Sequence, residues 1–209
     1  MNMKLLLYII SLAFLFTGCK PDEQQMERKP ESFPLSNVRL LDGPFKHACD
    51  LNVDVLLQYD VDRLLTPFLK EAGLKPKAES FPNWIDLDGH IGGHYLSALA
   101  IHYAATGNEA CKERMEYMIA ELSQCQQAHG NGYLGGQPGA LDKIYNRIKA
   151  GNGKAAADAW APWYNLHKMY AGLRDAWYYG KNETARDMSA SCAIGGLPSY
   201  RLWMTNRWS

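Results

Sequence analysis

The chain has 209 residues, which is enough for one domain with a substantial hydrophobic core. Its 22 Lys and Arg residues balance its 22 Asp and Glu residues, so the composition points to neither nucleic acid nor an anionic membrane surface as a partner. Six Trp and twelve Tyr agree better with a carbohydrate-facing domain than with an ordinary helical one.

Residues 1–19 are expected to be a lipoprotein signal peptide. Lys4 supplies a positive start, and the apolar run over residues 5–16 is too short to span a bilayer comfortably. The run ends in Leu-Phe-Thr-Gly-Cys, which resembles a bacterial lipobox and makes Cys19 the lipidated residue. An ordinary secretory signal is the alternative, but it would leave Cys19 without a purpose.

Residues 20–34 are expected to form a disordered tether, because their Pro, Glu, Gln and Lys residues leave almost nothing to bury. Asp22 and Glu23 follow the lipidated cysteine, as in the surface-export signal of Bacteroidota-type lipoproteins. We therefore expect a lipid anchor that makes the membrane a partner. It would place the folded part at the outer membrane or cell surface, or in the periplasm, of such a bacterium.

The folded part is expected to begin near Leu35. Apolar residues at three- and four-residue steps predict helices over residues 45–59, 95–107, 109–127 and 160–180, with a loop-rich stretch over residues 68–82. Strand-like alternation is nearly absent, so the fold class is all-α. The five cysteines form no CxxC pair, and Cys111 and Cys125 lie in helical patterns as buried thiols, so no disulfide or metal site is expected among them.

Two pairs of polar residues precede the second predicted helix. His90 and His94 have the i, i+4 spacing of a zinc pair, but Gly89, Gly92 and Gly93 argue against a regular helix there, and no glutamate lies between them. A zinc protease is therefore not expected. Asp86 and Asp88 could be a carboxylate pair for glycoside hydrolysis, although turn formation and helix capping is the more economical interpretation.

A glycine loop, HGNGYLGG over residues 129–136, follows the third predicted helix. It lacks the Lys and the Ser or Thr of a phosphate-binding loop. We interpret it as a close backbone approach to a ligand or to a neighbouring loop.

The helix over residues 160–180 carries the strongest functional signal. Its apolar face is predicted to consist of Leu166, Met169, Tyr170, Leu173 and Trp177. His167 lies in its first turns, close in sequence to Trp163 and Tyr164. Aromatic rings stack on the apolar face of a sugar and imidazole nitrogens hydrogen-bond its hydroxyls, so this group suits a sugar-binding cleft. A core helix whose histidine caps a neighbour remains an equal alternative.

An internal repeat links this helix to the second one. His94 and Gly107 have counterparts at the same spacing in His167 and Gly180, and each helix is followed by a second one that opens with Asn-Glu. Repeated helix pairs of this length predict a toroid or solenoid, in which both histidines would face one site.

Several motifs in a fixed order resemble glycoside hydrolase families 127 and 146, the β-L-arabinofuranosidases. The motifs are VRLLDGPF (38–45), DRLLTPF (62–68), DGHIGGHYLSALA (88–100), YAATGN (103–108), GNGYLGG (130–136) and WYNLHKMYAGLRDAW (163–177). The resemblance implies that residues 35–188 are the N-terminal part of an (α/α)6 toroid. It also implies retaining removal of terminal β-L-arabinofuranosyl groups from plant glycans.

The resemblance assigns roles to only some residues of this chain. His167 matches a histidine that contacts the sugar, and His90 and His94 match a histidine–glycine motif near the cleft. In this family a zinc-bound cysteine is the nucleophile and a glutamate is the acid/base, but these residues belong to a part that follows where this chain ends. We therefore expect this chain to contain no zinc ligand and no catalytic residue. It would then be an inactive N-terminal fragment.

Residues 189–209 are expected to be a frameshifted tail. The helical pattern runs to Met188 and is followed by adjacent glycines, a proline and no helical period. Read one frame away, the same stretch can encode a continuing amphipathic helix. Two other functions stay open at this point: a carbohydrate-binding helical module without catalysis, and a different, complete toroid glycosidase that uses Asp86 and Asp88.

Overall fold

The computed structural model describes residues 32–82 and 87–195. All regular elements of these residues are helices and none is a strand, which confirms the all-α prediction for them. Their elements are η1 (Leu35–Asn37), α2 (Pro44–Gln58), α3 (Val61–Glu71), α4 (His90–Thr106), α5 (Glu109–His129), η2 (Leu141–Tyr145), α6 (Asn146–Lys149), η3 (Gly153–Asp158), α7 (Pro162–Tyr178) and α8 (Glu183–Gly195). Within these ranges, none of the helices has the length and apolar character needed to cross a bilayer.

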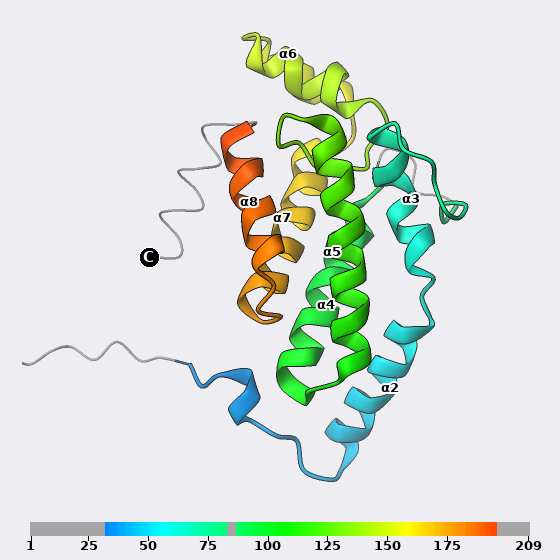
Figure 1. Cartoon of the computed structure of the whole chain (residues 1–209), viewed down its shortest axis with the longest axis vertical. Coiled ribbons are helices and arrows are strands. Elements are labelled where there is room, and N and C mark those ends of the chain that lie inside the picture. The colour runs from blue at the N-terminus through cyan, green and yellow to red at the C-terminus, as the bar shows by residue number, and fades with distance from the viewer. Residues whose placement is uncertain (1–31, 83–86, 196–209) are drawn as a thin grey trace, which may run out of the picture. The chain divides into compact units, whose positions relative to one another are not determined.

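Two antiparallel helix pairs form the centre of the described structure. Helix α4 turns at Gly107 into α5, and α7 turns near Gly180 into α8 (Figure 1). Helices α4 and α7 run in the same direction and lie side by side, with α5 and α8 returning beside them. The repeated helix pairs expected from the sequence are therefore present, and equivalent ends of α4 and α7 come together.

The core lies between these helices. Helix α5 buries the face that the periodicity predicts, namely Met115, Met118, Ile119 and Leu122. Helix α7 buries Leu166, Met169, Tyr170 and Leu173 as predicted, but Trp177 is 39% exposed and Ala176 takes the inward position. In the turn after α7, a Cβ on Gly180 would lie 2.5 Å from Met115 Sδ, so this turn lies close to the Met115 side chain of α5.

The glycines of the HIGGH stretch do not interrupt a helix, contrary to the sequence-based expectation. Helix α4 begins at His90 and includes both Gly92 and Gly93. A Cβ on Gly92 would lie 2.9 Å from the Phe68 ring, and a Cβ on Gly93 would lie 2.7 Å from the backbone nitrogen of Met169. The glycines are therefore required by packing between helices, which outweighs their low helix propensity.

Gly172 makes the reciprocal approach from α7. A Cβ there would lie 2.6 Å from the carbonyl oxygen of Gly93. The backbones of α4 and α7 thus touch at one crossing point with no side chain between them.

One helix, α3, was not predicted, and another, α8, extends further than expected. Helix α3 runs to Glu71 because Phe68 and Leu69, placed in a loop-rich stretch, are buried core residues. Helix α8 continues past Met188 to Gly195, with Ser189 Oγ donating to the Ala185 carbonyl at 2.9 Å and Cys192 Sγ lying 3.1 Å from Gln126 Nε2. The helical pattern therefore does not break at Met188; residues 196–209 of the expected frameshifted tail lie outside the described residues.

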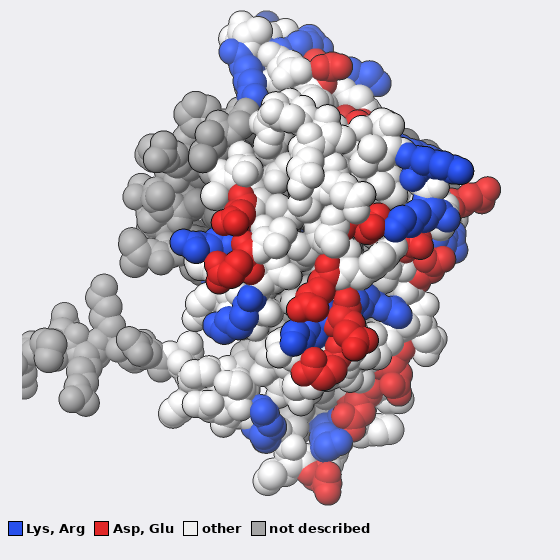
Figure 2. Space-filling model, in the orientation of Figure 1, with Lys and Arg blue, Asp and Glu red and all other residues white. Residues whose placement is uncertain are grey.

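The glycine loop makes the close approach that the sequence predicts, and its partner is a neighbouring loop. A Cβ on Gly136 would lie 3.0 Å from Gly89 Cα and 3.2 Å from the Asp88 carbonyl oxygen. On the face seen in Figure 2, acidic and basic side chains lie side by side.

Replacement of Gly93 by Ala should lower the free energy of unfolding by about 3 kcal/mol or more, because the new methyl group meets backbone that cannot rotate away. Chemical denaturation of both proteins measures the difference. Gly153→Ala is the matched control, since a Cβ there meets nothing within 4 Å. A cost for Gly93→Ala no greater than that of the control would show that the two helices do not touch as described.

Candidate functional site

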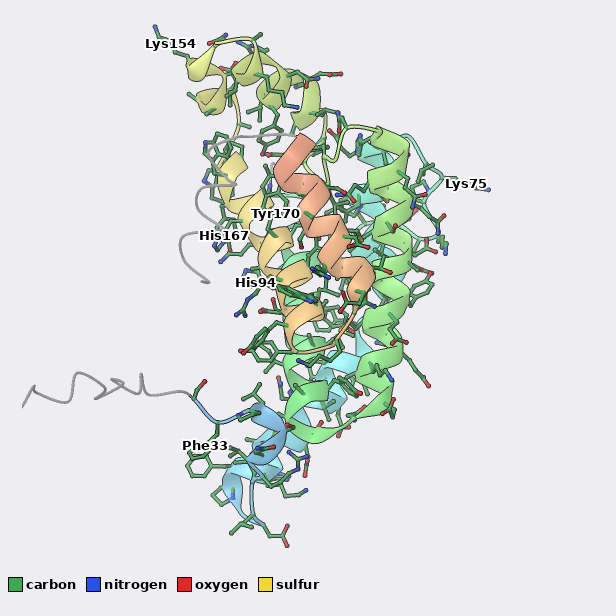
Figure 3. All side chains as sticks on the ribbon, turned by 60° about the vertical axis from the view of Figure 1, so that its left-hand side comes forward. Phe33, Lys75, His94, Lys154, His167 and Tyr170 are labelled. Carbon is green, nitrogen blue, oxygen red and sulfur yellow. The ribbon has the colours of Figure 1, made fainter. Side chains whose placement is uncertain are left out.

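The N-terminal turns of α4 and α7 bring together the residues singled out from the sequence. His94 Nε2 lies 3.2 Å from the Tyr164 hydroxyl, within hydrogen-bonding distance. The ring centroid of His90 lies 6.4 Å from that of His94 and 5.9 Å from that of Tyr164. In Figure 3, His94 and His167 project on the same side of the α4–α7 pair. Two histidines of α4 and a tyrosine and a histidine of α7 therefore form one cluster.

The histidines of this cluster differ in accessibility. His90 is only 6% exposed, and its Nδ1 lies 2.5 Å from the Leu87 carbonyl oxygen, so that nitrogen carries the proton. His94 is exposed and His167 is half-buried. His94 and His167 are therefore the imidazoles best placed to meet a ligand, and His90 is held by the backbone behind them.

Positive charge gathers around His94. Partial burial lowers the pKa of His94, and Lys168, His90 and His167 lower it further through electrostatic repulsion. Lys168 Nζ lies 4.8 Å above the Tyr164 ring, a cation–π contact. His94 is thus held neutral, and a neutral imidazole can both donate and accept a hydrogen bond.

Trp163 faces a different neighbour from Tyr164. Its ring packs edge-on against Tyr145 of η2, with centroids 5.8 Å apart, while 44% of the residue stays exposed. Trp163 therefore contacts η2 and exposes an aromatic surface, and in the sequence it immediately precedes Tyr164 of the cluster.

Sequence reasoning missed two residues of this region. Lys168 follows Tyr164 at i+4, and that spacing alone would place its ammonium over the ring. Tyr145 carries no comparable signal, because its hydroxyl donates to the Pro162 carbonyl, at 2.9 Å, across an intervening loop.

The alternative glycosidase hypothesis requires Asp86 and Asp88 as a pair of carboxylates, and the structure describes only one of the two. Asp88 lines a small cavity of about 20 Å³ together with Arg63 and His90, which has room for a water molecule and not for a sugar. Asp86 lies outside the described residues.

The zinc site implied by the resemblance does not fit the described residues. No three of their His, Cys, Asp and Glu side chains gather closely enough to hold a metal ion. Cys111 and Cys125 are buried thiols, as predicted, and burial raises the pKa of Cys125 to about 12. In the absence of a metal ion, a thiol with so high a pKa stays protonated near neutral pH and is a poor nucleophile.

Removal of the Lys168 charge should raise the pKa of His94 towards its ordinary value, because the imidazolium would lose a repulsive neighbour. NMR titration of the His94 ring protons in Lys168→Gln measures this shift. Lys181→Gln, on the same helix pair but outside the cluster, is the control. An unchanged His94 pKa in Lys168→Gln would contradict the described placement of the ammonium.

Comparison with known families adds an independent finding. The sequence model described as "Beta-L-arabinofuranosidase, GH127 catalytic domain" matches residues 37–194, which includes both helix pairs and every residue of the cluster. No curated protein matches the chain. Because the family match covers most of the 209 residues, the chain belongs to the GH127 β-L-arabinofuranosidase catalytic-domain family, a family of glycoside hydrolases.

Proposed function

We propose that the cluster of His90, His94, Tyr164 and His167 binds a terminal β-L-arabinofuranosyl residue of a plant glycan. The observation that carries this proposal is the meeting of two parallel helices at their N-terminal turns, where histidines and an aromatic ring face one side. An uncharged furanose offers several hydroxyls and one apolar face, and these side chains match both.

The neutral state of His94 supports the same class of ligand, an uncharged sugar. A neutral His94 can donate to one sugar oxygen and accept from another hydroxyl. The exposed ring of Trp163 next to the cluster adds a surface for stacking against a second sugar unit of the glycan.

The two helix pairs are proposed to be consecutive layers of an (α/α)6 toroid. Their inner helices α4 and α7 run parallel, which is the arrangement that points equivalent ends at a common cleft. The catalytic cysteine, its zinc ion and the acid/base glutamate are expected from the family resemblance, and no described residue is assigned to any of these roles.

Replacement of His167 by Ala should weaken the binding of methyl β-L-arabinofuranoside about tenfold, the scale of one lost hydrogen bond in a positioned site. NMR chemical shifts of the His94 ring protons during titration with the glycoside give the dissociation constant in each protein. The fold should persist, because the half-buried His167 side chain faces outward.

His47→Ala provides the control, since His47 is an exposed histidine of α2 outside the cluster. Equal weakening by both substitutions, or a wild-type chain whose cluster resonances do not respond to the glycoside, would overturn the proposal. A collapse of thermal stability in His167→Ala would instead support the alternative of a core histidine.

We also propose that Cys19 carries a lipid that anchors the protein to a bacterial membrane at the cell surface or in the periplasm. The apolar run that ends in Thr-Gly-Cys before a polar stretch supports this proposal. Labelling with a fatty-acid analogue should mark the wild-type protein and spare Cys19→Ala, whereas Cys49→Ala should be labelled normally. Labelling of Cys19→Ala at the wild-type level would exclude the anchor.

A further inference from the structure

We propose that Glu71 and Tyr145, two residues outside the histidine cluster, are positioning residues that set where α7 begins and therefore where Tyr164 meets His94. The proposal rests on the proposed function only in assigning a sugar to the cluster. The positioning itself is carried by a continuous series of contacts from α3 to α7.

The start of α7 is a strained turn. Ala161, the residue before the helix, has φ 47° and ψ 49°, the left-handed conformation that is unfavourable for a residue with a Cβ. Its carbonyl oxygen accepts from the backbone N–H of Tyr164 at 3.0 Å and of Asn165 at 3.3 Å. The conformation of Ala161 thus directly sets the first turn of α7, and a strained residue persists only where its surroundings hold it.

Two side chains from the preceding segment hold this turn on both sides of Ala161. Tyr145 donates its hydroxyl to the Pro162 carbonyl at 2.9 Å, in a buried contact. Gln137 donates its amide N–H to the Trp160 carbonyl at 3.3 Å. The Tyr145 ring also packs against Trp163. Both Gln137 and Tyr145 are themselves buried, so neither can release the turn without disturbing the core.

Glu71 fixes the segment that carries Tyr145. Its Oε2 accepts from the backbone N–H of Gly139 at 2.6 Å, and its Oε1 accepts from that of Leu141 at 3.3 Å. These N–H groups open η2, whose buried face carries Ile144 and Tyr145. A carboxylate at the start of a helical turn satisfies donors that have no partner within the turn. The last residue of α3 therefore orients η2.

The series of contacts ends at the histidine cluster. From Glu71 it passes through the start of η2 to Tyr145, from Tyr145 to Pro162, and through the first turn of α7 to Tyr164, which lies 3.2 Å from His94. None of the residues that make these contacts, from Glu71 to Pro162, is a member of the cluster. Their effect on sugar binding should therefore be indirect and should appear as a change in the geometry of Tyr164 and His94.

Tyr145→Phe tests this inference because it removes one hydroxyl and keeps the ring. We expect the His94 ring resonances and their pH titration to shift as Tyr164 moves, and affinity for methyl β-L-arabinofuranoside to fall about fivefold, the scale of one hydrogen bond. Tyr133→Phe is the matched control: Tyr133 is a buried tyrosine that packs against Tyr145 with centroids 5.4 Å apart, and its hydroxyl has no hydrogen-bond partner among the described residues.

A double-mutant cycle separates positioning from a general loss of stability. Glu71→Gln should shift the same His94 resonances in the same direction, and adding it to Tyr145→Phe should change them little further, because both act through η2. The inference would be overturned if both single variants had the same His94 resonances as Tyr133→Phe. It would also be overturned if the shifts of the two substitutions were fully additive in the double variant. Resonance shifts in both variants, together with no glycoside binding by the wild-type chain, would retain the positioning role and reject the proposed function.

Discussion

The contact between Gly93 of α4 and Gly172 of α7 is the constraint on which the rest of the structure depends. Because neither residue has a side chain, the two backbones meet directly, and a Cβ on Gly172 would lie 2.6 Å from the Gly93 carbonyl oxygen. That crossing fixes both the distance and the register of the helices. His94 follows Gly93 immediately, and Tyr164 and His167 lie within the preceding turns of α7. The site geometry is thus a direct consequence of the glycine contact, since a wider separation would take the Tyr164 hydroxyl out of reach of His94.

The electrostatics of the cluster follow from the same packing. Parallel helices place their positive N-terminal ends together, and Lys168 adds a full charge beside them. This environment disfavours an imidazolium, which agrees with the lowered pKa of His94. A neutral His94 beside aromatic rings can donate a hydrogen bond and accept one, and the nearby Lys168 charge disfavours a cationic ligand. The family membership implies arabinose-containing glycans as substrates, and the lowered pKa of His94 is compatible with the uncharged sugar proposed above.

Local sequence patterns predicted the helices well and their mutual contacts poorly. The inward face of α5, with Met115 and Leu122, follows directly from three- and four-residue spacing. The same reasoning failed at Gly92 and Gly93, because glycine costs roughly 1 kcal/mol in an isolated helix while the decisive contact lies on another helix. It also placed Trp177 inward, whereas Ala176 is the buried residue and Trp177 is 39% exposed.

The histidine cluster was predictable as a set of residues, but the positions of its side chains relative to one another were not. The repeat linked His94 to His167 because equivalent ends of repeated helices meet, a property that one sequence can reveal. Tyr145 and Glu71 leave no such pattern in the sequence. Each bonds to a backbone carbonyl or N–H group, and because nearly every residue has these groups, the sequence does not show which one is the partner. The strain at Ala161 is equally invisible in the sequence, where alanine before Pro162 reads as an ordinary helix start. A conformation unfavourable for its own residue type must be held by tertiary contacts, and those contacts are the ones that reach from α3 to the start of α7. The position of Tyr164 relative to His94 therefore depends on residues that do not themselves belong to the cluster.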